Sequence, residues 1–251
     1  MFDLSGHVSL ITGGNSGIGM GYAQGLAKAG AKIALWGRDE AKNLRAEQQI
    51  AKLGVEVASF SGDVASEEDV VRQTEQTLER FGRIDSCFAN AGYGAPRPFL
   101  KMSLEDWRAV VSVNLDGVFL TFREAARHMV ERGGGGKLIA TSSIGSIHGM
   151  ATQAHYAATK SGVNALVRSL AVELGRHDIQ VNAVLPGWID TPATAPAIAY
   201  EKLRAMIVHR TPANRWGTIE DLEGVAVYLA SPESRFHTGD VLTVDGGYVV
   251  Y

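Results

Sequence analysis

In the stretch Thr12-Gly13-Gly14-Asn15-Ser16-Gly17-Ile18-Gly19, a predicted β-strand (His7–Thr12) turns into a predicted helix (Gly17–Ala29). Glycines at such a turn let the backbone approach a ligand closely, and the helix N-terminus then favours an anionic phosphate. The spacing is not Gly-x-Gly-x-x-Gly, because Tyr22 stands at the third position, and no Gly-Lys-Ser/Thr of a P-loop follows. The turn therefore predicts another kind of phosphate site, and a tight turn that binds nothing is the alternative.

Outward from this turn, short β-rich runs alternate with longer helical patterns along the whole chain. The predicted strands are His7–Thr12, Lys32–Trp36, Val55–Phe60, Ile84–Ala89, Lys137–Ser142, Ile179–Leu185 and Val241–Val244. The predicted helices are Gly17–Ala29, Asp39–Leu53, Ser66–Phe81, Ser103–Arg132, Gln153–Gly175 and Thr218–Ala230. This order predicts a Rossmann-type α/β fold, a doubly wound parallel sheet of about seven strands in a three-layer α/β/α arrangement. A dinucleotide would lie across the carboxyl ends of the strands.

The domain organisation is expected to be simple. No linker interrupts the alternation, so residues 1–251 are expected to form a single dinucleotide-binding domain. The segment 190–216 fits least well, because it holds three prolines and only a weak helical pattern at Ala197–His209. An interruption of this kind often forms a lid over a site. We therefore expect a substrate lid at about residues 190–216.

Composition and charge exclude several classes of protein. The 251 residues are 45% hydrophobic and 20% charged, with a net charge of −3, so neither nucleic acid nor an anionic membrane is expected as a partner. The one cysteine, Cys87, excludes an intrachain disulfide and a cysteine metal site, and no metal is expected. We recognise no signal segment and no bilayer-spanning apolar run, so a cytoplasmic protein is expected.

The pair Tyr156 and Lys160 is the strongest candidate for catalysis. Their spacing of four residues places a phenol and an ammonium on one face of a helix, one turn apart. A phenol ordinarily loses its proton near pH of about 10, and a neighbouring cation lowers that pKa. A tyrosine of this kind can exchange a proton with a substrate oxygen near neutral pH. The pattern is weak alone, and a surface lysine on an ordinary helix is its alternative.

The end of the second strand bears on the choice of dinucleotide. It reads Leu35-Trp36-Gly37-Arg38-Asp39, and the position expected to contact the adenosine ribose is Gly37, followed by Arg38. A guanidinium suits a 2′-phosphate, which favours NADP. An alignment shifted by one or two residues would give Asp39 the acidic role and restore NAD. Arg38 paired with Asp39 or simply solvated is the other alternative.

Taken together, these patterns resemble the short-chain dehydrogenase/reductase family over essentially the whole chain. Thr12–Gly19 matches the family's glycine turn, and Tyr156 with Lys160 matches its Tyr-x-x-x-Lys motif. The other matching motifs are Asp63-Val64, Asn90-Ala91-Gly92, Asn114, Ser143, Pro186-Gly187, Thr191 and Asp245-Gly246-Gly247. The resemblance implies an NAD(P)-dependent oxidoreductase that acts on CH–OH groups and is usually a homotetramer.

The resemblance also implies the role of single residues. Tyr156 would be the general acid or base, Ser143 would hold the substrate oxygen, Lys160 would bind the nicotinamide ribose and lower the tyrosine pKa, and Asn114 would anchor a relay water. Cofactor contacts are expected from Gly13, Asn15, Ser16, Gly17, Ile18, Gly19, Arg38, Asp63, Val64, Asn90, Ala91, Gly92, Tyr156, Lys160, Pro186, Gly187, Ile189 and Thr191. Contacts with a small-molecule substrate are expected from Tyr93, Ser143, Gly145, His148, Gln153, Tyr156 and Trp188.

Several of these residues have alternative interpretations. Ser142 is an alternative to Ser143, Asn114 could serve only to bend its helix, and Asp63 could serve only to cap the next one. Asn90 is expected to hold strand edges together as well as to line the cofactor site. Trp188 either flanks the nicotinamide or belongs to the core.

The sequence predicts the identity of the substrate less well than it predicts the fold or the cofactor. The segments Leu35–Asp39 and Pro186–Thr191 are similar to those of sugar-acid and polyol members such as gluconate dehydrogenases, and also to 3-oxoacyl-carrier-protein reductases. A carrier protein would favour a basic surface, for which the candidates are Arg97, Lys101, Lys202, Arg204, Arg210 and Arg215. No arginine or lysine is identified for a sugar carboxylate. A non-catalytic dinucleotide-binding regulator and a catalyst of isomerisation or dehydration are alternatives on the same fold.

Overall fold

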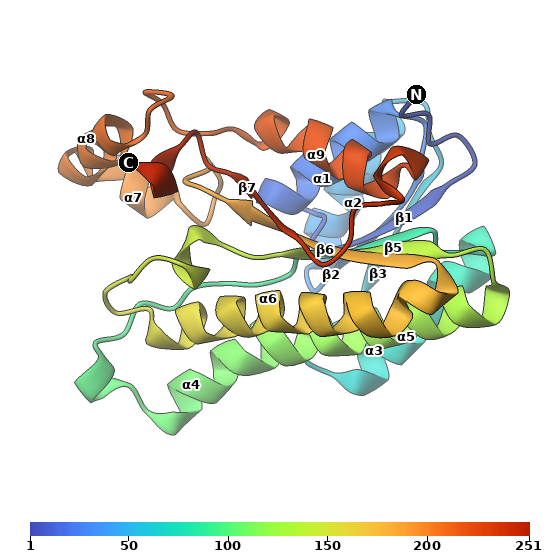
Figure 1. Ribbon diagram of the computed structural model, residues 1–251, viewed down its shortest axis with the longest axis horizontal. Helices are drawn as coiled ribbons and strands as arrows, with labels where there is room; N and C mark the ends of the chain where they lie inside the picture. The colour runs from blue at the N-terminus through green and yellow to red at the C-terminus, as the bar shows by residue number, and fades with distance from the viewer.

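The computed structural model describes all residues, 1–251, and is built on a parallel sheet in the order β3-β2-β1-β4-β5-β6-β7 (Figure 1). The strands are β1 (Val8–Thr12), β2 (Lys32–Gly37), β3 (Val57–Ser61), β4 (Ser86–Ala89), β5 (Gly136–Thr141), β6 (Ile179–Pro186) and β7 (Val241–Val244). The order reverses between β1 and β4, which is the point where open sheets of this kind bind ligands. The predicted fold class is confirmed.

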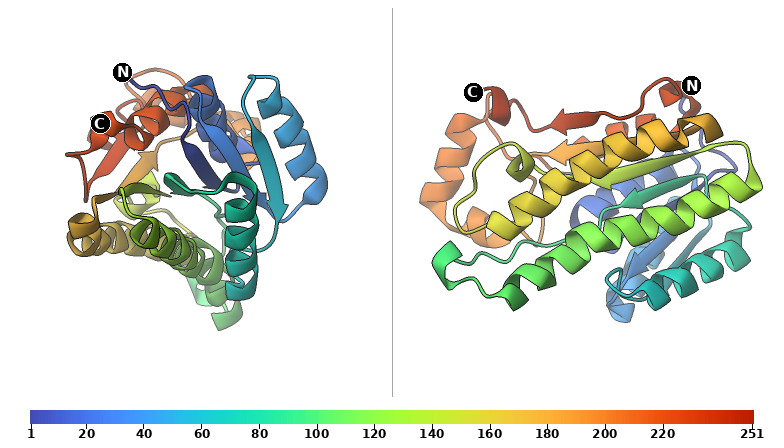
Figure 2. Two further views of the ribbon diagram at one scale, coloured as in Figure 1. Left: turned by 90° about the vertical axis from the view of Figure 1, so that its right-hand side faces the viewer. Right: turned by 60° about the horizontal axis from the view of Figure 1, so that its bottom comes forward.

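Helices cover both faces of the sheet (Figures 1 and 2). One layer contains α1 (Gly17–Lys28), α2 (Glu40–Ala51) and α9 (Glu223–Ala230). The other contains α3 (Glu67–Phe81), α5 (Gly117–Arg132) and α6 (Ala154–Leu174), and α4 (Leu104–Val111) packs on α6. None of the helices is both long and apolar enough to span a membrane.

The core explains why the strands are apolar on both faces. Leu10 and Ile11 are neighbours in β1, yet they belong to separate clusters on opposite sides of the sheet. Leu10 packs with residues of α3, α5 and α6, whereas Ile11 packs with those of α1, α2 and α9. Side chains alternate across a strand, so a strand between two helical layers buries every residue.

The structure corrects three predicted elements. The helix predicted at Ser103–Arg132 is interrupted by a π turn at Ser112–Asp116, where the Gly117 N–H donates to the Ser112 carbonyl. The helix predicted at Thr218–Ala230 begins as a 3₁₀ turn, and α9 starts only at Glu223. The weak helix of the expected lid is two helices, α7 (Ala195–Ala199) and α8 (Glu201–Arg210), because Tyr200 between them is extended.

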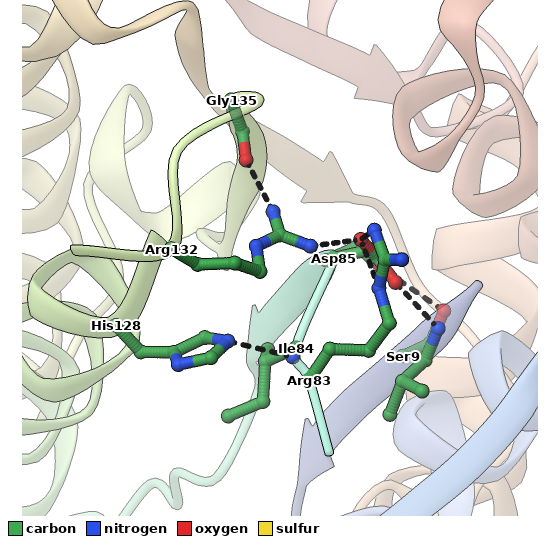
Figure 3. Close-up of polar contacts among 9 residues, drawn as sticks. Ser9, Arg83, Ile84, Asp85, His128, Arg132 and Gly135 are labelled. Carbon is green, nitrogen blue, oxygen red and sulfur yellow. Dashed lines mark hydrogen bonds and ion pairs between the residues drawn. The ribbon is translucent and has the colours of Figure 1, made fainter. Parts of the chain in front are cut away.

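The amino edge of the sheet is tied together by Asp85, which directly precedes β4. Its carboxylate accepts hydrogen bonds from Arg83 at 2.6 Å, from Arg132 at 2.6 Å and from the Val8 N–H at 2.9 Å (Figure 3). These donors keep the pKa of Asp85 below its ordinary value although burial opposes them. A charge held by three donors from separate segments fixes their positions.

A buried lysine lies at the same edge. Lys137, the second residue of β5, is only 8% exposed, and its Nζ donates to Gln180 Oε1 at 2.7 Å and to Ser234 Oγ at 3.1 Å. Burial lowers the pKa of Lys137 to about 8. Its two polar partners belong to β6 and to the segment after α9, so the lysine joins β5 to both.

Candidate active site

The glycine turn between β1 and α1 leaves donors free at the carboxyl edge of the sheet. Gly13 and Gly17 have φ values of +62° and +54°, which favour glycine, and a Cβ on Gly19 would collide with the Gly13 carbonyl. Ser16 is the N-cap of α1, but its side chain caps no N–H. Thr191 lies over the turn, with its Cβ 3.4 Å from where a Cβ on Gly17 would lie. The first N–H groups of α1 are therefore available to an anion.

Asn90 holds the strand ends around this turn. Its Nδ2 donates to the Thr12 carbonyl at 3.0 Å, and its Oδ1 accepts from Thr141 Oγ1 at 3.1 Å. Thr12 Oγ1 in turn accepts the N–H groups of Asn90 and Ala91 at 3.0 and 2.9 Å. These bonds join β1, β4 and β5, so the expected tie by Asn90 is confirmed.

The end of β2 has the arrangement that the predicted preference for NADP requires. Gly37 is the last residue of the strand, and the exposed Arg38 follows it directly. Asp39 is the N-cap of α2, and its carboxylate accepts the Lys42 N–H at 3.0 Å. Asp39 is thus engaged with its own helix, and the shifted alignment that would give it the ribose is not supported.

Asp63 lies beside Arg38 at the end of β3. Its Oδ2 is 3.6 Å from Arg38 Nη1, and its Oδ1 accepts the Ala65 N–H at 3.0 Å. The N-cap of α3 is Ser66, so Asp63 does not cap that helix. Asp63 instead closes the turn before α3 and faces the guanidinium expected to recognise the adenosine end.

Asn43 is a residue of this region that the sequence interpretation missed. It is 1% exposed, and its Nδ2 donates to the Gly37 carbonyl at 2.8 Å and to Ser61 Oγ at 3.2 Å. Its Oδ1 accepts from Asn15 Nδ2 at 2.7 Å. One side chain therefore fixes the ends of β2 and β3 and the glycine turn. Its place two helical turns before the buried Ile50 was the available signal.

Tyr156 and Lys160 lie on one face of α6, with Lys160 Nζ 5.7 Å from the centre of the Tyr156 ring. Lys160 is 4% exposed and donates to the Thr141 carbonyl at 2.8 Å, and burial lowers its pKa to about 8. Burial raises the pKa of Tyr156, and a hydrogen bond with Ser143 opposes part of that rise. The expected lowering of the tyrosine pKa by Lys160 is therefore wrong for the polypeptide alone, where desolvation of the phenolate is the larger effect.

Ser143 and Ser142 point in different directions. The Ser143 hydroxyl lies near enough to the Tyr156 phenol to lower its pKa, and it accepts the Gly145 N–H at 3.0 Å. The Ser142 hydroxyl lies against Ser146 Oγ at 3.3 Å and the Lys160 carbonyl at 3.5 Å. The contacts favour Ser143 over Ser142 as the serine beside the tyrosine.

The π turn places Asn114 against the loop that follows β4. Asn114 is fully buried, and its amide accepts the Tyr93 N–H at 3.0 Å and donates to the Tyr93 carbonyl at 2.9 Å. Its Oδ1 and Lys160 Nζ lie 3.1 and 3.4 Å from where a Cβ on Gly92 would lie. Asn114 therefore does more than bend its helix, because it fixes the backbone next to Lys160.

The other expected substrate contacts are divided between two places. Gly145 lies against Tyr156, whose Cε1 is 3.3 Å from where a Cβ would lie, and Gln153 lies against Gly94. The Tyr93 hydroxyl donates to a carbonyl of α4 at 2.9 Å, away from these residues. His148 and Trp188 instead join a separate aromatic group around Tyr248.

Comparisons with known proteins agree with this geometry. The family model described as "Enoyl-(Acyl carrier protein) reductase" matches residues 13–249. The chain belongs to the short-chain dehydrogenase/reductase family. Among members of the family, gluconate 5-dehydrogenase of Gluconobacter oxydans (strain 621H) is 36% identical over 250 residues, which are 100% of this chain and 97% of that protein.

Two further relatives extend the comparison. The 5-keto-D-gluconate 5-reductase of Escherichia coli (strain K12) is 38% identical over 253 residues, covering 100% of this chain and 98% of that protein. The crystal structure of a gluconate 5-dehydrogenase from Burkholderia cenocepacia J2315, in complex with NADP and tartrate, is 37% identical, with a TM-score of 0.95. That match covers 100% of this chain and 98% of the other. This short-chain dehydrogenase/reductase therefore shares its whole length with its relatives.

Proposed function

We propose that the protein is an NADP(H)-dependent oxidoreductase that interconverts a secondary alcohol and a ketone of a polyol or sugar acid. The observation that carries the proposal is the Tyr156 ring on one face of α6 with the buried Lys160 ammonium 5.7 Å from its centre, and with Ser143 close enough to affect the pKa of the phenol. This group lies at the carboxyl ends of the strands that also carry the glycine turn. The names of the gluconate 5-dehydrogenase and 5-keto-D-gluconate 5-reductase relatives support the substrate class.

The residues fit a dinucleotide. The N–H groups of α1 lack a side-chain cap, an added Cβ at Gly19 would meet the Gly13 carbonyl, and one at Gly13 would meet the Ala91 backbone. Arg38 and Asn15 would hold the adenosine end, and Lys160 would hold the ribose at the reacting end. The Lys160 ammonium has a single hydrogen-bond partner in the protein, so it retains two donors for hydroxyl groups.

When bound, the dinucleotide supplies the hydride chemistry. Tyr156 donates a proton to the carbonyl oxygen in reduction, and its raised pKa keeps the proton available for that step. Ser143 donates a hydrogen bond to the same oxygen as negative charge develops there. In oxidation Tyr156 must act as a base, and the Lys160 ammonium stabilises the phenolate through its charge.

Arg38 carries the proposed preference for NADP, and a substitution tests it. In Arg38→Asp we expect the KM for NADPH to rise roughly 10- to 100-fold, because a guanidinium that pairs with phosphate is replaced by a like charge. The KM for NADH should stay the same or fall. Arg45→Asp, at an exposed arginine of the α2 helix that follows Arg38, is the matched control. Equal KM values for NADPH in wild type and Arg38→Asp would contradict this preference.

The basic surface expected for a carrier-protein substrate is only partly present, so this substrate is less well supported than a polyol or sugar acid. Arg97 pairs with Asp106, and Arg215 forms a bidentate pair with Asp221. Arg210 is half-buried, which leaves only the exposed Lys101, Lys202 and Arg204 of the six. The tetramer and the cytoplasmic location stay predictions, to be tested by light scattering and by fractionation.

The experiment that tests the function is a panel of ketones that includes keto-sugar acids and neutral keto-polyols, read with NADPH and with NADH. We expect oxidation of NADPH with at least one member. A regulator would bind dinucleotide without turnover. A catalyst of isomerisation or dehydration would change substrate while the oxidation state of the dinucleotide stays constant over turnover.

A further inference from the structure

A group of aromatic and basic side chains lies around the ring of Tyr248, next to the segment that runs from Ser143 to His148. Arg210 Cζ lies 4.4 Å from the centre of the ring, at the end of α8. The His148 and Trp188 rings meet the same ring edge-on at 6.0 and 6.5 Å. Trp216 adds to the group through Trp188, at 5.4 Å between ring centres.

These side chains have polar atoms without partners. Arg210 Nε, His148 Nε2, Trp188 Nε1 and Trp216 Nε1 are all buried and form no hydrogen bond within the protein. Arg210 also forms none of the ion pairs of the structure, although Arg215, five residues later, is paired with Asp221. Buried donors are ordinarily satisfied, so a cluster of them indicates a ligand that accepts hydrogen bonds.

The charge of the cluster selects the class of ligand. Three of the four groups donate only, and the guanidinium is a planar fork that matches a carboxylate. Stacking on Tyr248 holds that fork in one orientation. No carboxylate of the protein neutralises Arg210, so the complementary group is an anion brought by the ligand.

The position of the cluster connects it to the reacting group. His148 lies at the end of the segment that begins with Ser143, and its N–H donates to the Ile144 carbonyl at 2.9 Å. Ile144 packs in one apolar cluster with Tyr248 and Ile207 of α8. The same short segment therefore meets Tyr156 at one end and the cluster at the other.

The nearby cavity between Trp188, Thr211 and Asp245, of about 150 Å³, is a weaker candidate. Its charged groups already have partners, because Arg215 binds Asp221 and the Asp245 carboxylate accepts the Gly247 and Val249 N–H groups. The cavity therefore has no unpaired charged side chain that would bind an ionic ligand.

We propose that Arg210, stacked on Tyr248 and flanked by His148 and Trp188, binds the carboxylate of the substrate and makes the enzyme specific for polyhydroxy acids over neutral polyols. The inference rests on the proposed function for the reaction itself. It assigns the substrate class to a residue of α8, so α8 would be fixed in place by the charged end of the substrate.

The test compares Arg210→Gln with Arg204→Gln, an exposed arginine of the same helix that loses the same charge. In Arg210→Gln, kcat/KM for a keto-sugar acid should fall roughly 10- to 100-fold, mostly through KM, because one charge-assisted contact is lost. The value for the matching neutral ketone should change less than about twofold, and Arg204→Gln should resemble wild type for both. Arg210→Lys should recover part of the loss, because it keeps the charge without the fork.

A second readout does not depend on turnover. Calorimetric titration of tartrate into the NADP-loaded enzyme should show weaker binding in Arg210→Gln and unchanged binding in Arg204→Gln. Equal losses for acidic and neutral ketones, or tartrate binding that is the same in both variants, would overturn the inference. Weakened tartrate binding in a protein that turns over no ketone would sustain the carboxylate site and overturn the proposed function.

Discussion

Each end of strand β5 is approached by a buried ammonium, and the two are partnered differently. Lys137 at the amino end donates to Gln180 and Ser234, whereas Lys160 at the carboxyl end donates only to the Thr141 carbonyl. Burial lowers the pKa of both to about 8. Burial therefore destabilises the charged ammonium about equally at both ends of β5. The two lysines differ in how many ammonium hydrogens are already bonded to the protein: Lys137 uses two to join segments, whereas Lys160 uses one and keeps two for a ligand.

The contrast extends to the two edges of the sheet. At the amino edge, both oxygens of Asp85 are taken by donors from separate segments (Figure 3). Of the ten buried side-chain atoms without a hydrogen-bond partner, five belong to Gln153 and the cluster around Tyr248, so the unsatisfied groups concentrate near the carboxyl edge. Substitutions at the two edges should therefore act on different quantities.

The largest effect is expected at the carboxyl edge, for Tyr156→Phe. Loss of the hydroxyl removes the proposed proton donor, and kcat should fall about 10³-fold, within the range for a general acid. Phenylalanine keeps the aromatic ring, so the free energy of unfolding and the Kd for NADPH should be unchanged from wild type. Turnover by absorbance and NADPH binding by fluorescence measure the two. A kcat within tenfold of wild type would show that another group donates the proton.

The two lysines give the sharpest comparison. Lys160→Met should lower kcat/KM by about 10²-fold, because both the proposed contact with the ribose and the charge beside Tyr156 are lost. Lys137→Met should leave kcat/KM within about twofold, since Lys137 lies at the opposite end of β5. Stopped-flow reduction on both variants decides the matter. Similar rates in the two would remove the distinction between the edges.

Breaking the Asp85 contacts should affect stability alone. Asp85→Asn leaves the half-exposed Arg83 and the largely buried Arg132 without a counter-charge, and we expect a loss of about 2 kcal/mol in the free energy of unfolding, because only one of the two pairs is mostly shielded from solvent. Glu56→Gln is the control, because Glu56 also lies between two cations, Lys32 and Arg80, but near the surface. It should cost under about 1 kcal/mol. Urea denaturation measures both, and a fall in kcat of the folded Asp85→Asn enzyme would contradict the separation.

A pH dependence of opposite sign is expected for stability and for rate. The folded pKa of Lys160 and of Lys137, about 8, lies below the ordinary value of 10.5, so folded protein releases these protons first as pH rises. The free energy of unfolding should therefore increase between these pH values. The rate of reduction should fall above pH of about 8, as Lys160 loses its charge. Lys137→Met should reduce the rise of the free energy of unfolding with pH and should leave the fall in the rate of reduction unchanged. Denaturation and kcat/KM profiles from pH 7 to about 10 measure the two.

The sequence was sufficient for the fold and for the order of its motifs, because strand and helix patterns and the glycine turn are local signals. The seven strands follow from these patterns. The place of Ser143 beside Tyr156 came from the family resemblance, which left Ser142 as an alternative. The π turn was not predicted, since nothing in Ser112–Asp116 distinguishes it from a regular helix. The contacts of Asn43 and Arg210 were also missed, because each depends on partners far away in the chain.

The π turn that carries Asn114 makes the function of this helix separable from its formation. A turn of this type holds one surplus residue inside an otherwise continuous helix. Deleting a single residue from Ser112–Asp116 would restore the ordinary repeat while α4 and α5 keep their phase. Circular dichroism should then report the same helix content from a protein that has lost the hydrogen bonds between Asn114 and Tyr93 and has lost turnover. The long helix would survive the loss of its own irregularity, and the chemistry would not.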